Sequence, residues 1–409
     1  MSLFDTFAIL IVLSASFAYI NYRFIKLPAA IGLMLIALLT SIALVALGRL
    51  YPPALADLTT LMSGIDFSKL LMEVMLGFML FAGAIHIRLE ELKKVKLAVI
   101  LFSTISVVLS TFIVGTGAYY LLGWFGMPMP YLYCLLFGSL ISPTDPIAVL
   151  GILKQARIDK ALEMKIAGES LFNDGVAVVV FLTILEVAMH PEAMEWTDVG
   201  VLFLREAGGG VLLGLGAGYA GFLLMRSIDN YKVEVLLTLA VVMGGYALAD
   251  RLHISGPLAM VVAGILIGNH GKRYAMSDLT AEYVDKFWEL LDETLNAILF
   301  VLIGLELVVL HWSTNYVILG LISIVLVLLA RFTSVWVPAQ IIRLRGDMTR
   351  RTILILTWGG LRGGISIALA LSLTPELGKD LWVTLTYFVV AFSILVQGLT
   401  VGRLARATS

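Results

Sequence analysis

Ser142-Pro143-Thr144-Asp145-Pro146 lies in the middle of an apolar segment that covers residues 130–150. Proline lacks a backbone donor and clashes with the preceding turn, and the residue before a proline avoids helical geometry. Two prolines around Thr-Asp therefore predict that a helix in this segment is interrupted. The Thr144 carbonyl and hydroxyl then become possible cation ligands. Asp145 can cap the positive end of a second half-helix that begins at Pro146.

A second interruption is predicted by Trp358-Gly359-Gly360-Leu361-Arg362-Gly363-Gly364, in the apolar segment at 352–373. Glycine weakens a helix, and here four glycines surround an arginine. Paired interrupted helices at corresponding positions of two halves are typical of transporters with inverted repeats, whose binding site lies at the membrane midplane. The correspondence here is one of position, because the two halves share no visible sequence similarity.

The composition indicates an integral membrane protein. The chain is 60% hydrophobic and only 14% charged, whereas soluble domains carry about 25% charged residues. Its mean hydropathy is +0.98. The single cysteine, Cys134, can form no internal disulfide, and no metal-binding spacing is present. The predicted fold class is an all-α membrane protein of about 13 transmembrane helices, with spans 5 and 12 interrupted. The segments are 3–21, 28–48, 70–87, 97–122, 130–150, 166–189, 200–226, 233–250, 255–268, 283–310, 315–342, 352–373 and 380–401.

The distribution of basic residues predicts the orientation. Most of the 28 Lys and Arg residues lie in or beside the loops that follow odd-numbered spans. Such loops face the cytoplasm by the positive-inside rule. We therefore expect integration in the plasma (inner) membrane, with the N-terminus outside and the C-terminus in the cytoplasm. The charged run from Glu90 to Lys96 is expected to be a solvated cytoplasmic loop.

Charged residues within the spans need a partner or a purpose, because each costs roughly 2.5–3.5 kcal/mol at the bilayer centre on insertion scales. Four acids against two arginines leave an excess of carboxylate, which suits cation binding rather than anion binding. These residues are Glu73, Asp145, Glu169, Asp174, Arg331 and Arg362.

The densest polar group is Gly168-Glu169-Ser170-Leu171-Phe172-Asn173-Asp174-Gly175. Helical residues four apart share a face, so Ser170 lies beside Asp174 and Glu169 beside Asn173. Hydroxyl and carboxylate oxygens are the ligands that hard cations take. A satisfied polar contact between helices would explain one Asn or Ser. Two carboxylates within six residues favour function.

These motifs resemble those of the cation/proton antiporters of the NhaP and NHE type. The resemblance rests on Pro-Thr-Asp-Pro at 143–146, on Gly-Glu-Ser-Leu-Phe-Asn-Asp-Gly at 168–175 and on Gly-Gly-Leu-Arg-Gly at 359–363. It is also carried by the segment from Phe287-Trp288-Glu289 to Glu306. The resemblance implies a secondary transporter, not an enzyme, that exchanges Na+ or Li+ for H+. Family members with Asn-Asp at 173–174 are electroneutral.

The resemblance also implies roles for individual residues. Asp174 binds cation and proton in competition, Ser170 and the Thr144 carbonyl add Na+ ligands, and Glu73 is a further ligand or a water-mediated partner. Asp145 offsets half-helix N-termini, while Asn173 ties span 6 to the broken span 5 between Pro143 and Pro146. Glu169 forms a buried ion pair with an arginine. We favour Arg331 for this pair and assign Arg362 to helix C-terminal dipoles, although the sequence does not decide between them.

At the level of domains, the resemblance implies a homodimer in which a core moves against a scaffold. The scaffold and dimerisation helices are 1–95 and 233–310, the core is 96–190 and 315–409, and 200–226 is a linking helix. The expected partners are membrane lipid and monovalent cations, with no nucleic acid and no cofactor, and the expected role is pH homeostasis.

Three alternatives remain open at this stage. K+/H+ exchange would use the same residues, because cation choice depends on cavity size. An intramembrane aspartyl hydrolase would use Asp145 and Asp174 on a shared water. A passive channel would dissipate a Na+ gradient without moving protons.

Overall fold

The chain folds entirely into helices within the residues that the computed structural model describes, which are 3–50, 67–155, 159–190, 196–308, 310, 312–343 and 348–407. The first half contains α1 (Leu3–Ile20), η1 (Asn21–Ile25), α2 (Ala29–Leu50), α4 (Phe67–Lys69), η2 (Leu70–Met75), α5 (Leu76–Ile85), α6 (Leu89–Trp124), α7 (Tyr131–Leu140), α8 (Ile147–Gln155), α9 (Lys160–Met189) and α10 (Trp196–Arg226). The second half contains α11 (Tyr231–Leu252), α12 (Gly256–Leu266), η3 (Ile267–Gly271), α13 (Lys272–Tyr274), α14 (Asp278–Leu305), η4 (Glu306–Val308), α15 (Thr314–Arg343), α16 (Arg350–Trp358), α17 (Gly364–Leu371), η5 (Pro375–Leu377), α18 (Lys379–Phe392), η6 (Ser393–Gln397) and α19 (Gly398–Ala407).

Nine of these helical stretches in the described ranges are long and apolar enough to cross a membrane. Each of the thirteen segments expected from the sequence overlaps at least one of the helices. The count of thirteen spans stays a prediction, because the interrupted and the charged segments do not meet the same test of length and hydropathy. Residues 51–66, which belong to the expected scaffold, lie outside the described residues.

One expectation about a connection was wrong. The run from Glu90 to Lys96 is not a loop, because α6 begins at Leu89 and continues without a break to Trp124. Glu90 and Glu91 lie in its first turn, where acidic side chains stabilise the positive end of the helix dipole. A boundary between scaffold and core at residues 95 and 96 would therefore cut a continuous helix.

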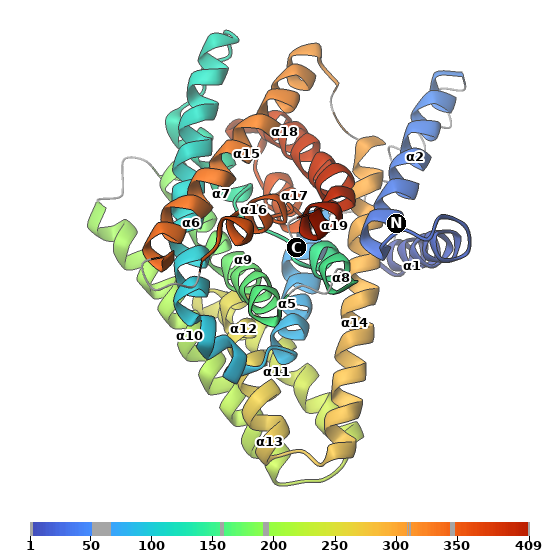
Figure 1. Ribbon diagram of the computed structural model, residues 1–409, viewed down its shortest axis with the longest axis vertical. Helices are drawn as coiled ribbons and strands as arrows, with labels where there is room; N and C mark the ends of the chain where they lie inside the picture. The colour runs from blue at the N-terminus through green and yellow to red at the C-terminus, as the bar shows by residue number, and fades with distance from the viewer. Residues whose placement is uncertain are drawn as a thin grey trace.

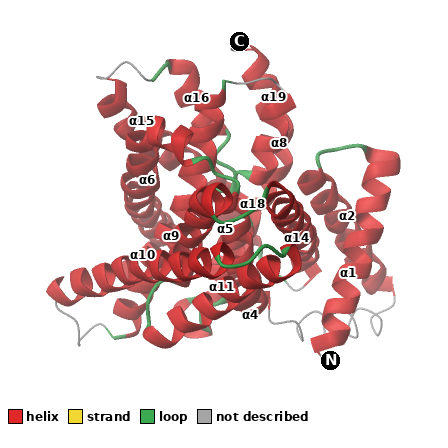
Figure 2. Cartoon of the chain, turned by 90° about the horizontal axis from the view of Figure 1, so that it is seen from below, coloured by secondary structure: helices red, strands yellow, loops and turns green. Residues whose placement is uncertain are grey.

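The two predicted interruptions are present, and they meet. The chain leaves helical geometry at 141–146, between α7 and α8, and again at 359–363, between α16 and α17. The Asp145 amide donates to the Leu361 carbonyl at 2.8 Å, so the two non-helical segments lie side by side. Figure 1 shows α16 and α17 near the centre of the molecule, and Figure 2 shows α8 beside α19.

Close contact between α6 and α7 depends on Gly138. A Cβ atom at this position would lie 2.1 Å from the backbone oxygen of Thr111 on α6. That oxygen is fixed in the helix and cannot move away as a flexible side chain could. The interrupted α7 is therefore held against a long, continuous helix at a distance that only glycine allows.

We expect Gly138→Ala to destabilise the protein by about 1–3 kcal/mol, the usual effect of overpacking. The matched control is Gly244→Ala on α11, where an added Cβ would meet nothing within 4 Å. The control should be neutral or slightly stabilising, because alanine favours a helix. Thermal unfolding in detergent measures both variants. Equal unfolding temperatures would show that α6 and α7 separate without cost.

Candidate functional site

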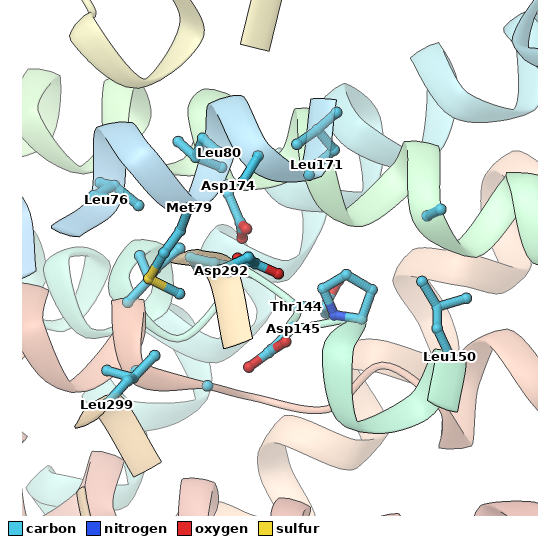
Figure 3. A pocket seen from close by; sticks show the side chains of 18 of the residues that line it. Leu76, Met79, Leu80, Thr144, Asp145, Leu150, Leu171, Asp174, Asp292 and Leu299 are labelled. Atoms are coloured by element: carbon cyan, nitrogen blue, oxygen red, sulfur yellow. The ribbon is translucent and has the colours of Figure 1, made fainter. Parts of the chain in front are cut away.

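A cavity of about 350 Å³ lies beside the interruption between α7 and α8. Its walls come from α5, the broken segment, α8, α9, α14 and the start of α17. Most of the lining is apolar. The polar side chains that line it are those of His86, Thr144, Asp145, Asp174 and Asp292. Figure 3 shows the carboxylates of the three aspartates directed into the same space.

Asp174 lies in the middle of α9 and is the most deeply buried of the three aspartates that line the cavity. The residue is only 7% exposed, and its Oδ1 atom has no hydrogen-bond partner among the described residues. A buried carboxylate without a partner is costly unless a proton or a cation compensates it. The position is therefore one at which binding of either species relieves an unfavourable state.

Asn173 and Ser170 connect α9 to the broken segment through Thr144. The Asn173 amide nitrogen donates to Thr144 Oγ1 at 2.6 Å, and the Thr144 backbone amide donates to Asn173 Oδ1 at 3.3 Å. The Thr144 and Ser170 hydroxyl oxygens lie 3.2 Å apart. Ser170 is one helical turn from Asp174, as the spacing in the sequence predicts. Ser170 therefore lies next to Thr144 and one turn from Asp174, behind the two residues that line the cavity.

Glu169 points away from the cavity and forms an ion pair with Arg331 of α15. Its Oε1 atom lies 2.6 Å from Arg331 Nη1, and the two side chains are 2% and 6% exposed. Arg331 Nη2 also donates to the Leu356 carbonyl of α16 at 3.0 Å. A Cβ atom on Gly360 would lie 2.3 Å from Arg331 Nε, so glycine makes room for the guanidinium.

Arg362 satisfies the carbonyls at the C-terminal end of α7. Its Nη1 atom donates to the backbone oxygens of Ser142 and Pro143, the latter at 3.0 Å. A cation at this end of a half-helix interacts favourably with the helix dipole. The Arg362 backbone amide in turn donates to Ser393 Oγ at 2.9 Å. Arg331 thus pairs with Glu169, and Arg362 binds backbone carbonyls. The sequence alone did not decide between the two assignments.

Asp145 lies where the two non-helical segments, 141–146 and 359–363, meet. Its side chain packs against Gly363, where a Cβ atom would come within 2.7 Å of the Asp145 Cβ atom. Pro146 follows, and α8 begins at Ile147. Pro143 and Pro146 both line the cavity, so the two prolines border the space as well as interrupting the helix.

Two expected cation ligands, Ser170 and Glu73, do not line the cavity. Ser170 contacts Thr144, which does line it, whereas Glu73 is exposed. Its side chain is 63% exposed and lies 4.0 Å from Lys69. Leu76, Leu80 and Gly83, which follow at helical spacing, do line the cavity. Glu73 lies in the wide π-helical turn η2, whose extra residue per turn moves it off this face. Its assignment as a ligand stays a prediction.

Asp292 and His86 line the cavity but were not expected from the sequence to do so. His86 Nδ1 lies 3.3 Å from Asp285 Oδ1, and Lys272 also forms an ion pair with Asp285. The signal that could have found this group is the spacing of Asp285, Asp292 and Leu299, which recur every seven residues along α14. Such a spacing places all three on one face of a helix.

The chemistry of the cavity is that of a site for a small cation. Three carboxylates face it, while Arg331 is paired with Glu169 and Arg362 is occupied by backbone oxygens. Thr144 and Asp174 bring a hydroxyl and a carboxylate to the cavity, and the Ser170 hydroxyl lies beside that of Thr144. Oxygen ligands of these types suit hard cations.

Known proteins are similar to this chain in sequence and in fold. The Na(+)/H(+) antiporter NhaP of Pseudomonas aeruginosa is 51% identical over 408 residues, covering 98% of this chain and 96% of that protein. The Na(+)/H(+) antiporter NhaH of Halobacillus dabanensis is 33% identical over 405 residues, covering 97% and 96%. The solved structure of the sodium proton antiporter MjNhaP1 from Methanocaldococcus jannaschii at pH 8 matches with a TM-score of 0.76, at 21% identity, over 98% of this chain and 97% of that one.

The structural match confirms the expected fold class, an all-α membrane protein. The family model described as sodium/hydrogen exchanger, transmembrane, matches residues 12–407. The resemblance carried by the motifs around Asp145, Asp174 and Arg362 is therefore confirmed over nearly the whole chain. The chain belongs to the transmembrane sodium/hydrogen exchanger family.

Proposed function

We propose that this exchanger carries one Na+ or Li+ against one H+ in each cycle, and that the two compete for Asp174. The observation that supports this proposal is the buried Asp174 carboxylate, which lines the cavity with one oxygen unpartnered among the described residues. Na+/H+ exchange makes the chain a secondary transporter. Membership of the family excludes the alternative of an intramembrane hydrolase.

Coupling follows from the cost of moving a bare charge. When Asp174 carries neither a cation nor a proton, its movement through an apolar gate would carry an uncompensated charge, which is unfavourable at membrane depth. The core therefore changes its access only when Asp174 is occupied. The Ser170 hydroxyl and the Thr144 oxygens complete the cation site. Activity should fall at acid pH, because protons then outcompete the cation.

Asn173 makes the exchange electroneutral in this proposal. It is an amide beside Asp174, and both of its polar atoms are bonded to Thr144. An amide has no proton to exchange at physiological pH. One titratable carboxylate then alternates between one cation and one proton, so no net charge moves.

The wider setting of the cycle is also proposed. The helices with the two interruptions form the core, which moves against a scaffold that includes α5, α12 and α14 and that dimerises with a second copy. The excess of Lys and Arg after odd-numbered spans supports a cytoplasmic C-terminus in the plasma (inner) membrane. The cycle uses Na+ and H+ as substrates, needs no cofactor and serves pH homeostasis.

The test is exchange by purified protein in liposomes that contain a pH-sensitive dye. Pulses of Na+ or Li+ should dissipate a preset pH gradient at an initial rate that a valinomycin voltage clamp does not change. A rate that depends on the clamp would refute electroneutrality. Exchange with K+ but not with Na+ would establish the K+/H+ alternative, and Na+ flux without proton movement would identify a channel.

A further inference from the structure

Asp292 lies on α14, a helix outside the interrupted segments, and faces the same cavity as Asp174. The residue is half-buried, its carboxylate accepts a hydrogen bond from the Asn296 side chain, and no ion pair joins it to a cationic side chain in the described ranges. Asp174 provides the independent sign that this cavity takes a ligand, because it is 93% buried and aims an unpartnered oxygen into the same space.

The residues along α14 change in character from one end of the cavity to the other. Asp285 lies beside His86, where α5 ends, and is paired with Lys272. Asp292 follows two turns further, about 10 Å along the helix axis. Leu299 follows after two more turns. It is fully packed, and a Cβ atom on Gly364 would lie 2.2 Å from its Cδ1 atom. From the His86 end inward, this face of α14 thus presents Asp285 in an ion pair, Asp292 without an ion pair, and the buried apolar side chain of Leu299.

Asp292 does not form a three-carboxylate metal site with Asp145 and Asp174. No group of three His, Cys, Asp or Glu side chains in the described part of the chain converges on a position that could hold one metal ion. Asp145, Asp174 and Asp292 therefore face a common space, but the three carboxylates do not converge on one ion position. A cation near Asp292 keeps room for water in a cavity of about 350 Å³, since one water needs only about 30 Å³.

We propose that Asp292 is a loading site, which holds a partly hydrated alkali cation before the cation reaches Asp174. This inference rests on the proposed binding role of Asp174. A cleft of one charge sign with walls of low dielectric constant raises the local concentration of counter-ions and their association rate by about 10–10³. Asp292 accordingly sets the apparent affinity for the cation on the side of the membrane nearer His86, which we call the cavity side. It has little part in the movement of the core.

The test is Asp292→Asn, measured as Na+-dependent proton movement in membrane vesicles of the two opposite orientations. The KM for Na+ should rise about tenfold on the cavity side and stay within twofold on the other side, with kcat within twofold of the wild type. The matched control is Glu293→Gln, which removes the same charge from the exposed neighbouring position. It should leave the KM unchanged. Asp292→Glu, which restores the charge, should recover most of the affinity.

Several outcomes would overturn the loading site. They are an unchanged KM, an equal rise in Glu293→Gln, a fall in kcat alone, or a shift of the pH profile with a normal KM at alkaline pH. Asp292→Ser provides a second variant if the asparagine protein does not fold, as judged by its unfolding temperature. Asp174→Asn in the same vesicles separates the two proposals. If that variant is inactive and Asp292→Asn is normal, only the loading site fails, whereas an active Asp174→Asn refutes the binding role itself.

Discussion

Asp174→Asn should abolish exchange while leaving the fold intact. The asparagine is neutral throughout the cycle and so imitates the protonated state without being able to release the proton. At 4 Å and an effective dielectric constant of 20, a charge pair is worth about 4 kcal/mol, and each 1.4 kcal/mol is a factor of ten. The rate of Na+-dependent proton movement should therefore fall by at least about 100-fold.

The same variant, Asp174→Asn, should be as stable as the wild type or more stable, although it loses activity. Asp174 is buried and has an unpartnered oxygen, so its charge opposes folding at a pH where it is ionised. The unfolding temperature of Asp174→Asn should equal or exceed that of the wild type. Glu186→Gln is the control, because it removes a half-exposed carboxylate from the same helix. Exchange by Asp174→Asn at the wild-type rate would refute the assignment.

Arg331→Met should be the most destabilising of the substitutions considered, at about 3–5 kcal/mol, because it leaves the buried Glu169 carboxylate without its partner. Replacing both members, in Glu169→Met with Arg331→Met, should recover much of this loss. A double-mutant cycle of unfolding free energies measures the coupling between them. Activity need not recover, because Arg331 also bonds to the Leu356 carbonyl beside the second interruption.

An exposed ion pair supplies the comparison. On α14, Lys286 Nζ lies 2.5 Å from Glu282 Oε1, and both side chains are more than half exposed. Lys286→Met should change the unfolding midpoint very little, because water solvates the remaining carboxylate. If Arg331→Met were as stable as Lys286→Met, the Glu169 pair would have no structural role.

The interruptions could be predicted from the sequence because their causes are local. Pro143 and Pro146, only three residues apart, both lack the backbone N–H that a helical turn needs, and the glycines around Arg362 weaken a helix by themselves. The common face of Ser170 and Asp174 follows from helical spacing alone. These features do not depend on which other helices are near.

The remaining features depend on tertiary contacts or on geometry that leaves no signal in the sequence. The π-helical turn at 70–75 displaces Glu73 from the face of Leu76, and nothing in its composition distinguishes it from an α-helical turn. Asp292 belongs to a charge-rich helix, where one more acid does not stand out until the cavity shows which face is lined. The partner of Glu169 is set by the packing of α9 near α15, which spacing along the chain cannot give.

The contact between Arg362 and the Ser142 carbonyl has a consequence for how the chain is made. The two residues are separated by 220 positions, so the first interruption leaves the ribosome long before the arginine that satisfies its carbonyls. Unsatisfied backbone groups cost several kcal/mol each in lipid. The half-helices α7 and α8 therefore cannot settle in the hydrocarbon core independently. We expect them to stay at the insertion machinery or the membrane interface until the second interrupted segment arrives, so that a chain truncated before residue 350 is retained and degraded rather than partly functional.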